Sequence, residues 1–175
     1  MRQRVTRDRL ERFMAAFADG TIPARIYLVG GATAVLFNWR DSTVDVDLKL
    51  VPDTDEVLRV LPKLKERLQI NIELAAPDDF IPALPGWQER SRFIKRQGAI
   101  DFFHYDFYGQ ALAKIERGHQ QDLTDVNQML KMGLIEPQKM WELFLKIQGE
   151  LYKYPAINQE SFRSDVENFV RKWKP

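Results

Sequence analysis

The spacing of apolar residues changes once along the chain, near residue 109. Before this point, alternating apolar and polar positions predict short strands that are joined by helical segments. After it, helical spacing dominates. The expected elements are a helix over 6–18, strands over 24–29, 44–51 and 70–74, helices after Gly31 and over 56–68, a hairpin of strands over 92–97 and 99–107, and helices over 110–117, 122–132, 137–152 and 159–172. The pattern predicts a small α/β core over about residues 20–108, followed by a helical bundle.

The strand over 44–51 carries the clearest candidate chemistry. Its apolar residues alternate with Asp45, Asp47 and Lys49, so the two carboxylates point to the same side of the strand. Like charges this close repel, and a hard divalent cation with oxygen ligands, Mg²⁺ above all, would compensate them. Upstream, Gly30-Gly31 marks a strand-to-helix turn, where backbone amides can approach phosphate oxygens. Together these features predict a site for a metal ion and a nucleoside triphosphate.

Two residues compete for the place of a third carboxylate on a neighbouring strand. Glu73 alternates with apolar residues in the strand after the next helix, and Asp101 lies within the hairpin. Phosphoryl and nucleotidyl transfer need such clusters because they depend on positioning and on neutralising charge. The sequence leaves both alternatives open.

Composition narrows the class of protein. The chain has 175 residues, 45% of them hydrophobic, a formal net charge of +1 and no cysteine, which indicates a folded protein without disulfides or thiolate metal sites. No apolar run approaches the roughly 18 residues of a spanning helix, so we expect a cytoplasmic protein with no membrane association. His104 and His119 are isolated in the sequence, which favours surface or packing roles over a zinc site.

Both ends of the chain are locally basic. The first 12 residues hold Arg2, Arg4, Arg7, Arg9 and Arg12, and the tail ends in Arg171-Lys172-Trp173-Lys174. Such arrays are typical of solvated helix faces with i,i+4 ion pairs. Contact with RNA phosphates is the alternative interpretation.

The order of these motifs resembles a known superfamily. Leu28-Val29-Gly30-Gly31, a helix, Arg40 and Thr43, and then Asp45-Val46-Asp47-Leu48 resemble the nucleotidyltransferases related to DNA polymerase β. The closer similarity is to a bacterial branch that contains abortive-infection-type toxins and uncharacterised relatives. Lys114-Ile115-Glu116-Arg117 and Asp122-Leu123-Thr124-Asp125 are similar to its downstream signature. The resemblance spans about residues 24–130 and leaves the last 45 outside it.

The resemblance implies a fold. We expect an α+β protein with a nucleotidyltransferase-like small mixed β-sheet and flanking helices, followed by a C-terminal helical bundle. The predicted domains are 1–108, which includes an N-terminal helix, and 109–175.

The resemblance also implies roles for individual residues. Gly30 and Gly31 would bind the triphosphate through backbone amides, with Arg40 or Thr43 near the phosphates. The implied Mg²⁺ or Mn²⁺ ligands are Asp45, Asp47 and Glu73. Lys114 would neutralise phosphate charge or orient the nucleotide, with Arg117 one helical turn away, and Asp122 or Asp125 would anchor the helical half.

Two functions follow as hypotheses. The first is Mg²⁺-dependent transfer of a nucleoside monophosphate from an NTP to an RNA, such as a tRNA end, or to a protein hydroxyl, in a toxin–antitoxin or phage-defence system. The second is a catalytically inactive binding module that acts as an antitoxin or complex subunit with the product of a neighbouring gene. Departures from the family pattern motivate the second, because Gly30-Gly31-Ala32 replaces a Gly-Ser step and Arg40 stands five rather than four residues before Asp45.

Overall fold

The computed structural model describes residues 2–19 and 22–173, which form two compact units. One unit comprises Met1–Ala76 and Ser91–Tyr105, and the other Pro77–Arg90 and Asp106–Pro175. The elements, in chain order, are β1 (Val5–Thr6), α1 (Arg7–Ala18), β2 (Ala24–Val29), α2 (Gly31–Leu36), β3 (Ser42–Thr43), β4 (Asp45–Val51), α3 (Asp55–Leu58), α4 (Val60–Leu68), β5 (Asn71–Leu74), η1 (Pro77–Asp79), α5 (Trp87–Arg90), β6 (Arg92–Gln97), β7 (Ile100–His104), α6 (Phe107–Arg117), α7 (Gln120–Lys131), α8 (Pro137–Ile147), η2 (Gln148–Lys153) and α9 (Gln159–Lys172).

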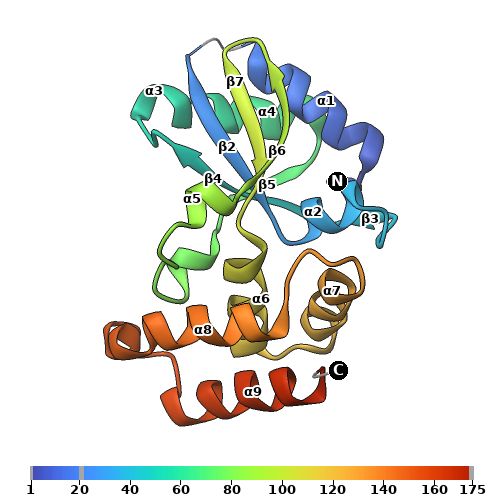
Figure 1. Cartoon of the computed structure of the whole chain (residues 1–175). Coiled ribbons are helices and arrows are strands. Elements are labelled where there is room, and N and C mark those ends of the chain that lie inside the picture. Colours follow the sequence, from blue (N-terminus) through green and yellow to red (C-terminus); the bar gives the residue numbers. More distant parts are fainter. Residues whose placement is uncertain (1, 20–21, 174–175) are drawn as a thin grey trace. The chain divides into compact units, whose positions relative to one another are not determined.

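The first unit is built on a five-stranded mixed sheet with the order β5-β4-β2-β7-β6 (Figure 1). β2 is antiparallel to β4 and parallel to β7, β4 is parallel to β5, and β6 and β7 form the expected hairpin. The predicted α+β class with a small mixed sheet is therefore confirmed. A separate pair of short strands, β1 and β3, joins the start of the chain to the segment before β4.

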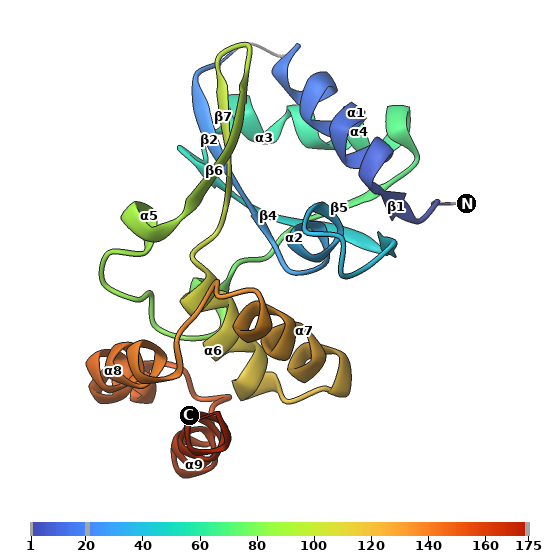
Figure 2. The same ribbon diagram turned by 45° about the vertical axis from the view of Figure 1, so that its right-hand side comes forward.

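One face of this sheet carries the hydrophobic core. Residues Ile26, Leu28, Val46, Leu48 and Phe102 are buried in a single cluster with side chains of α1 and α4, and Figures 1 and 2 show both helices on the same side of the strands. Burying a side chain of this size contributes about 1.5–3 kcal/mol. Because strand side chains alternate between faces, the acidic residues of β4 must point to the other face.

The second unit contains helices α6–α9, which pack together as the predicted helical bundle. Rings from α8 and α9 meet at its centre, where Phe144 and Phe162 lie edge to face with centroids 5.1 Å apart. The predicted helix over 137–152 is shorter than expected, because α8 ends at Ile147 and a 3₁₀ segment continues to Lys153.

One boundary prediction was wrong. The strand expected over 99–107 ends at His104, and a helix begins at Phe107 rather than at 110. The reason is a helix cap, because the carboxylate of Asp106 accepts a hydrogen bond from the backbone N–H of Tyr108 at 3.2 Å. An N-cap of this kind favours the helix over continued strand.

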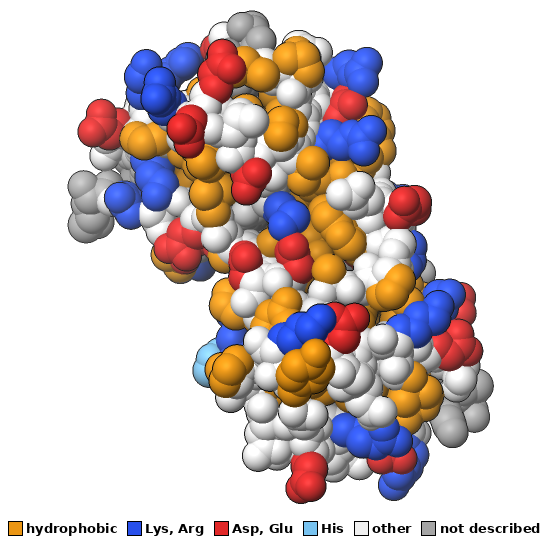
Figure 3. Space-filling model, turned by 90° about the vertical axis from the view of Figure 1, so that its left-hand side faces the viewer, with side chains coloured by type: hydrophobic (Ala, Val, Ile, Leu, Met, Phe, Trp, Pro, Cys, Tyr) orange, Lys and Arg blue, Asp and Glu red, His pale blue; other side chains and the backbone are white. Residues whose placement is uncertain are grey.

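In the described ranges 2–19 and 22–173, no helix has the length and hydrophobicity needed to cross a bilayer. On the face drawn in Figure 3, acidic and basic side chains are interspersed with hydrophobic ones rather than separated into regions of one sign.

Candidate functional site

Three carboxylates share the open face of β4 and β5. Asp45 and Asp47 are partly exposed and alternate with the buried residues of β4. The parallel pairing of the two strands sets Glu73, which is exposed, directly beside Asp47. Paired residues of adjacent strands, about 4.8 Å apart, point to the same face. The pairing therefore brings together the three acidic residues that the sequence singled out as metal ligands.

Asp101, the competing third carboxylate, lies at a different position along the strand direction. β2 pairs Arg25 with Asp101 and pairs Val29 with Asp47, and four residues along a strand span about 13 Å. The Asp101 carboxylate also accepts two hydrogen bonds from Arg96, at 2.6 and 2.8 Å. The hydrogen bond to Arg96 lowers the pKa of Asp101. The register therefore favours the carboxylate of β5 as the third member of the site.

An amide that sequence analysis missed connects two of the carboxylates. Asn71 Nδ2 donates to Asp45 Oδ1 and to Glu73 Oε1, each at 2.7 Å, and its Oδ1 accepts a hydrogen bond from Arg2. Asn71 precedes Glu73 by two residues, so strand alternation alone places both on one face. The sequence therefore contained the signal that places Asn71 and Glu73 on one face. The contact between Arg2 and Asn71 could not be predicted from local pattern, because it joins residues 69 positions apart.

The Gly-Gly turn lies at the end of β2 beside this acidic face. Gly30 has φ +59°, a left-handed conformation that favours glycine, and a Cβ at this position would lie 3.5 Å from Asp47 Oδ2. At Gly31 an added Cβ would lie 2.0 Å from Oγ1 and 2.6 Å from Cβ of Thr43. Thr43, in β3, is buried, and Arg40, between α2 and β3, is half-buried. The turn thus packs backbone closely against both β3 and Asp47.

Substituting Gly31 by Ala tests this packing. In most helices Gly→Ala stabilises the protein by about 0.5–1 kcal/mol, but here the new methyl group meets Thr43. We expect a loss of about 1–3 kcal/mol in unfolding free energy, measured by urea denaturation. Gly149→Ala is the matched control, because a Cβ there has no heavy atom within 4 Å. Equal stability of the two variants would contradict the close packing of Gly31 on Thr43.

A buried histidine packs beneath the turn. His104 Nδ1 lies 3.1 Å from Thr33 Oγ1, and the ring of Phe37 lies 4.7 Å from the imidazole ring. Burial, together with the charge of Arg92, lowers the pKa of His104 to about 4. The imidazole is therefore neutral at pH 7, and the expected packing role describes it well.

The lowered pKa of His104 predicts acid sensitivity. The unfolded chain takes up a proton near pH 6.5, whereas folded His104 does so only near pH 4. Neutral His104 therefore makes its full contribution to the unfolding free energy above pH 6.5. This contribution declines as the pH falls toward 4, by up to about 3 kcal/mol. Urea denaturation from pH 7.5 to 4.5 should show a shallower decline for His104→Gln than for the wild type. His119→Gln, the exposed control, should show the same pH dependence as the wild type. Identical pH profiles for the two variants would refute the assignment of the acid sensitivity to His104.

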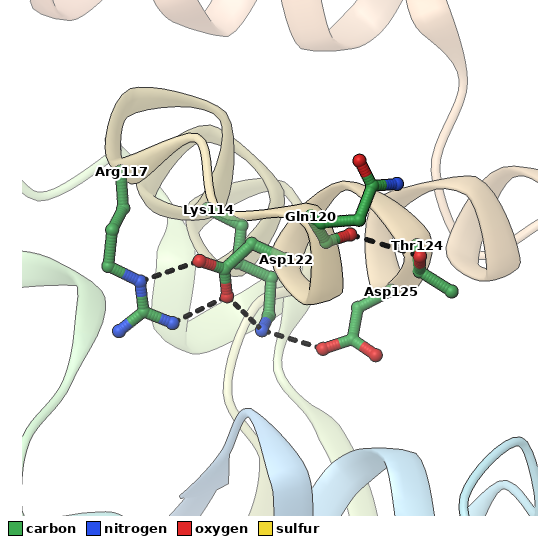
Figure 4. Close-up of polar contacts among 6 residues, drawn as sticks. All are labelled: Lys114, Arg117, Gln120, Asp122, Thr124 and Asp125. Carbon is green, nitrogen blue, oxygen red and sulfur yellow. Dashed lines mark hydrogen bonds and ion pairs between the residues drawn. The ribbon is translucent and has the colours of Figure 1, made fainter.

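The downstream motif forms a buried ion network inside the helical unit (Figure 4). Lys114 Nζ lies 3.2 Å from Asp122 Oδ1 and 2.8 Å from Asp125 Oδ2. Arg117 Nε donates to Asp122 Oδ2 at 2.7 Å. Burial alone would raise the pKa of Asp122, but the hydrogen bond from Arg117 and the two positive charges hold it below its usual value. The network joins α6 to α7.

The chemistry of the carboxylate set suits a divalent metal ion that arrives with its substrate. The described residues contain no group of three or more His, Cys, Asp or Glu side chains that could hold a metal ion. Mg²⁺, however, usually binds one or two protein carboxylates together with substrate phosphates and water. Asp45 and Asp47, oxygen donors on one strand face, fit that manner of binding.

The mixed sheet with a Gly-Gly turn and an Asp-x-Asp strand beside it is the arrangement that the sequence resemblance implies. Comparison with family models agrees: residues 9–174 match the family described as nucleotidyltransferase of unknown function (DUF6036), and the chain belongs to that family. The match extends well beyond the 24–130 of the sequence resemblance and includes the last helices, which that resemblance had left outside. No curated protein and no solved structure matches the chain.

Proposed function

We propose that the protein transfers a nucleoside monophosphate from an NTP to an acceptor hydroxyl. The observation that carries the proposal is the shared strand face of Asp45, Asp47 and Glu73 next to the Gly30 turn. Family membership supports the class of reaction. The Gly30 turn lies next to Asp47, since a Cβ at this position would be 3.5 Å from Asp47 Oδ2. A triphosphate bound to a metal at Asp47 would therefore lie beside this backbone.

Each group has a defined task in this reaction. Asp45 and Asp47 would hold the divalent ion, which, when bound, neutralises charge on the triphosphate and on the leaving pyrophosphate. The backbone at Gly30 and Gly31 would orient the phosphates. The acceptor oxygen would form a bond to the α-phosphorus, and the bond from that phosphorus to the oxygen bridging the α- and β-phosphates would break. Pyrophosphate would leave, and Glu73 would take the hydroxyl proton.

Arg40 and Thr43 belong to the phosphate side of the proposed site. They lie in the segment that leads from α2 into β4, and Thr43 contacts the Gly31 backbone position. We assign Lys114, Arg117, Asp122 and Asp125 to the stability of the helical unit, because the ammonium group already has two carboxylate partners.

The direct test is nucleotide incorporation. Purified protein is incubated with each labelled NTP, Mg²⁺ or Mn²⁺, and either bulk tRNA or the protein encoded by a neighbouring gene. The expected result is label in one acceptor with one NTP. The sequence resemblance suggests that this reaction belongs to a cytoplasmic toxin–antitoxin or phage-defence system. Equal background label with the wild type and with Asp45→Ala/Asp47→Ala would exclude the enzyme.

A second function has one observation in its favour. Asn71 already bridges Asp45 and Glu73, which describes a site that is filled by its own side chains, as in a non-catalytic binding module. Titration calorimetry separates the two functions. An active enzyme should bind Mg²⁺ and NTP together, whereas a binding module should bind neither of them and should bind its protein partner tightly.

A further inference from the structure

Four arginines near the N-terminus and one in α4 line two neighbouring hollows on the first unit. One hollow lies between Arg2, Arg4 and Asp45, and the other between Arg9, Arg12 and Arg67; Gln3 lines both. We call these five arginines the arginine strip. Because the hollows share Gln3, the strip continues from the C-terminal end of α4 to the first carboxylate of the candidate site.

Several contacts hold the strip in place, among them hydrogen bonds from Arg2 to Asn71 and from Arg9 to Gln3. Arg4 Nε donates to Ser42 Oγ at 2.8 Å, and Arg9 Nη1 donates to the carbonyl of Leu68 at 3.2 Å. Each guanidinium has five N–H groups, so one or two anchoring bonds leave others for a ligand. The expected i,i+4 ion pair is present at Arg12, which lies 2.9 Å from Asp8, and Arg67 lies 3.7 Å from Asp19. Both pairs are exposed, so they are weak and can exchange for phosphate contacts.

The charge of the strip is local. The chain as a whole has a formal net charge of only +1, yet the only carboxylate among the described residues lining either hollow is Asp45. The apolar lining is limited to Val44 and Leu68, without the aromatic anchors of protein–protein interfaces. A polyanion fits this lining better than a protein surface does.

We propose that the arginine strip binds the phosphodiester backbone of a single-stranded RNA segment and leads its reacting hydroxyl to Asp45. Guanidinium groups match phosphate oxygens in a bidentate fork, and spaced arginines can follow successive phosphates. This inference rests on the proposed function, for which it names RNA as the acceptor class. Arg2 and Arg4 lie before residue 9, where the family match begins.

The test is RNA binding without NTP or metal. Fluorescence anisotropy with an end-labelled 12-nucleotide RNA is measured across about 50–200 mM KCl. Removing three exposed charges with Arg4→Gln/Arg12→Gln/Arg67→Gln should weaken binding about tenfold or more. The slope of log affinity against log salt should fall by about two, since each phosphate contact contributes about 0.7.

A control variant removes the same charge elsewhere. Lys139→Gln/Lys146→Gln/Lys172→Gln changes three exposed residues of the helical unit and should leave RNA affinity nearly unchanged. Thermal unfolding verifies that both variants are folded. Absent RNA binding by the wild type, unchanged affinity of the strip variant, or equal losses in the two variants would each overturn the inference.

Failure of the proposed function would look different. If RNA binds through the strip but neither RNA nor protein accepts a nucleotide from any NTP, the transfer reaction is refuted and the strip remains an RNA-binding site. If transfer occurs only onto a protein and does not change in the strip variant, the reaction stands and the inference that RNA is the acceptor is refuted.

Discussion

Replacing Asp47 by Asn is expected to lower nucleotidyl transfer by about a thousandfold, or roughly 4 kcal/mol in activation free energy. The amide keeps the size of the side chain but removes the charge that would hold a divalent ion against the triphosphate. Asp47 is partly exposed on β4, so the fold should survive the change. The measurement is incorporation of labelled NMP under saturating NTP, with urea denaturation to verify folding.

Two further carboxylates turn this prediction into a test of the sheet register. Glu73 pairs with Asp47 across β4 and β5, and Glu73→Gln should also lose most activity. Asp101→Asn is the matched control, because its carboxylate belongs to the Arg96 pair at another level of the sheet. Manganese affinity, measured by electron paramagnetic resonance, should fall for Asp47→Asn and not for Asp101→Asn. The site is misplaced if Asp101→Asn is the more damaging change.

Local pattern was enough to predict the sheet face on which the carboxylates lie. Alternation along residues 44–51 separates Asp45 and Asp47 from the buried side chains, and the structure has the same separation. The position of Glu73 beside Asp47 needed strand pairing, which alternation does not provide. The choice between Glu73 and Asp101 therefore became possible only once the order β5-β4-β2-β7-β6 was known.

Features that depend on long-range contacts escaped prediction for the same reason. β1 and β3 are two-residue strands, too short to show a period, and they form only because Val5 pairs with Thr43. The bridge from Arg2 to Asn71 likewise joins distant segments. Helix start signals are local, yet the cap at Asp106 was overlooked because the preceding aromatic residues resemble a strand.

Replacing Lys114 by Met is expected to destabilise the helical unit by about 3–5 kcal/mol. Lys114 is 7% exposed, and its ammonium group lies between two buried carboxylates, those of Asp122 and Asp125. Removing one partner of a buried ion network leaves uncompensated charge, which costs far more than the intact network contributes. Urea denaturation should show a lower midpoint with an unchanged slope. Lys153→Met, at an exposed pair with Glu150, should cost less than about 1 kcal/mol.

A double-mutant cycle separates the network from a catalytic role for Lys114. Lys114→Met/Asp125→Asn should be less destabilised than the sum of the two single variants, by about 1 kcal/mol or more, because it removes opposite charges together. The network should also weaken in acid: the pKa of Asp122 is lowered by folding, so its contribution is present above the unfolded pKa and is lost as the pH falls through the folded one. If Lys114→Met instead keeps its unfolding free energy and loses nucleotidyl transfer, the ammonium group acts on the nucleotide and the structural assignment is wrong.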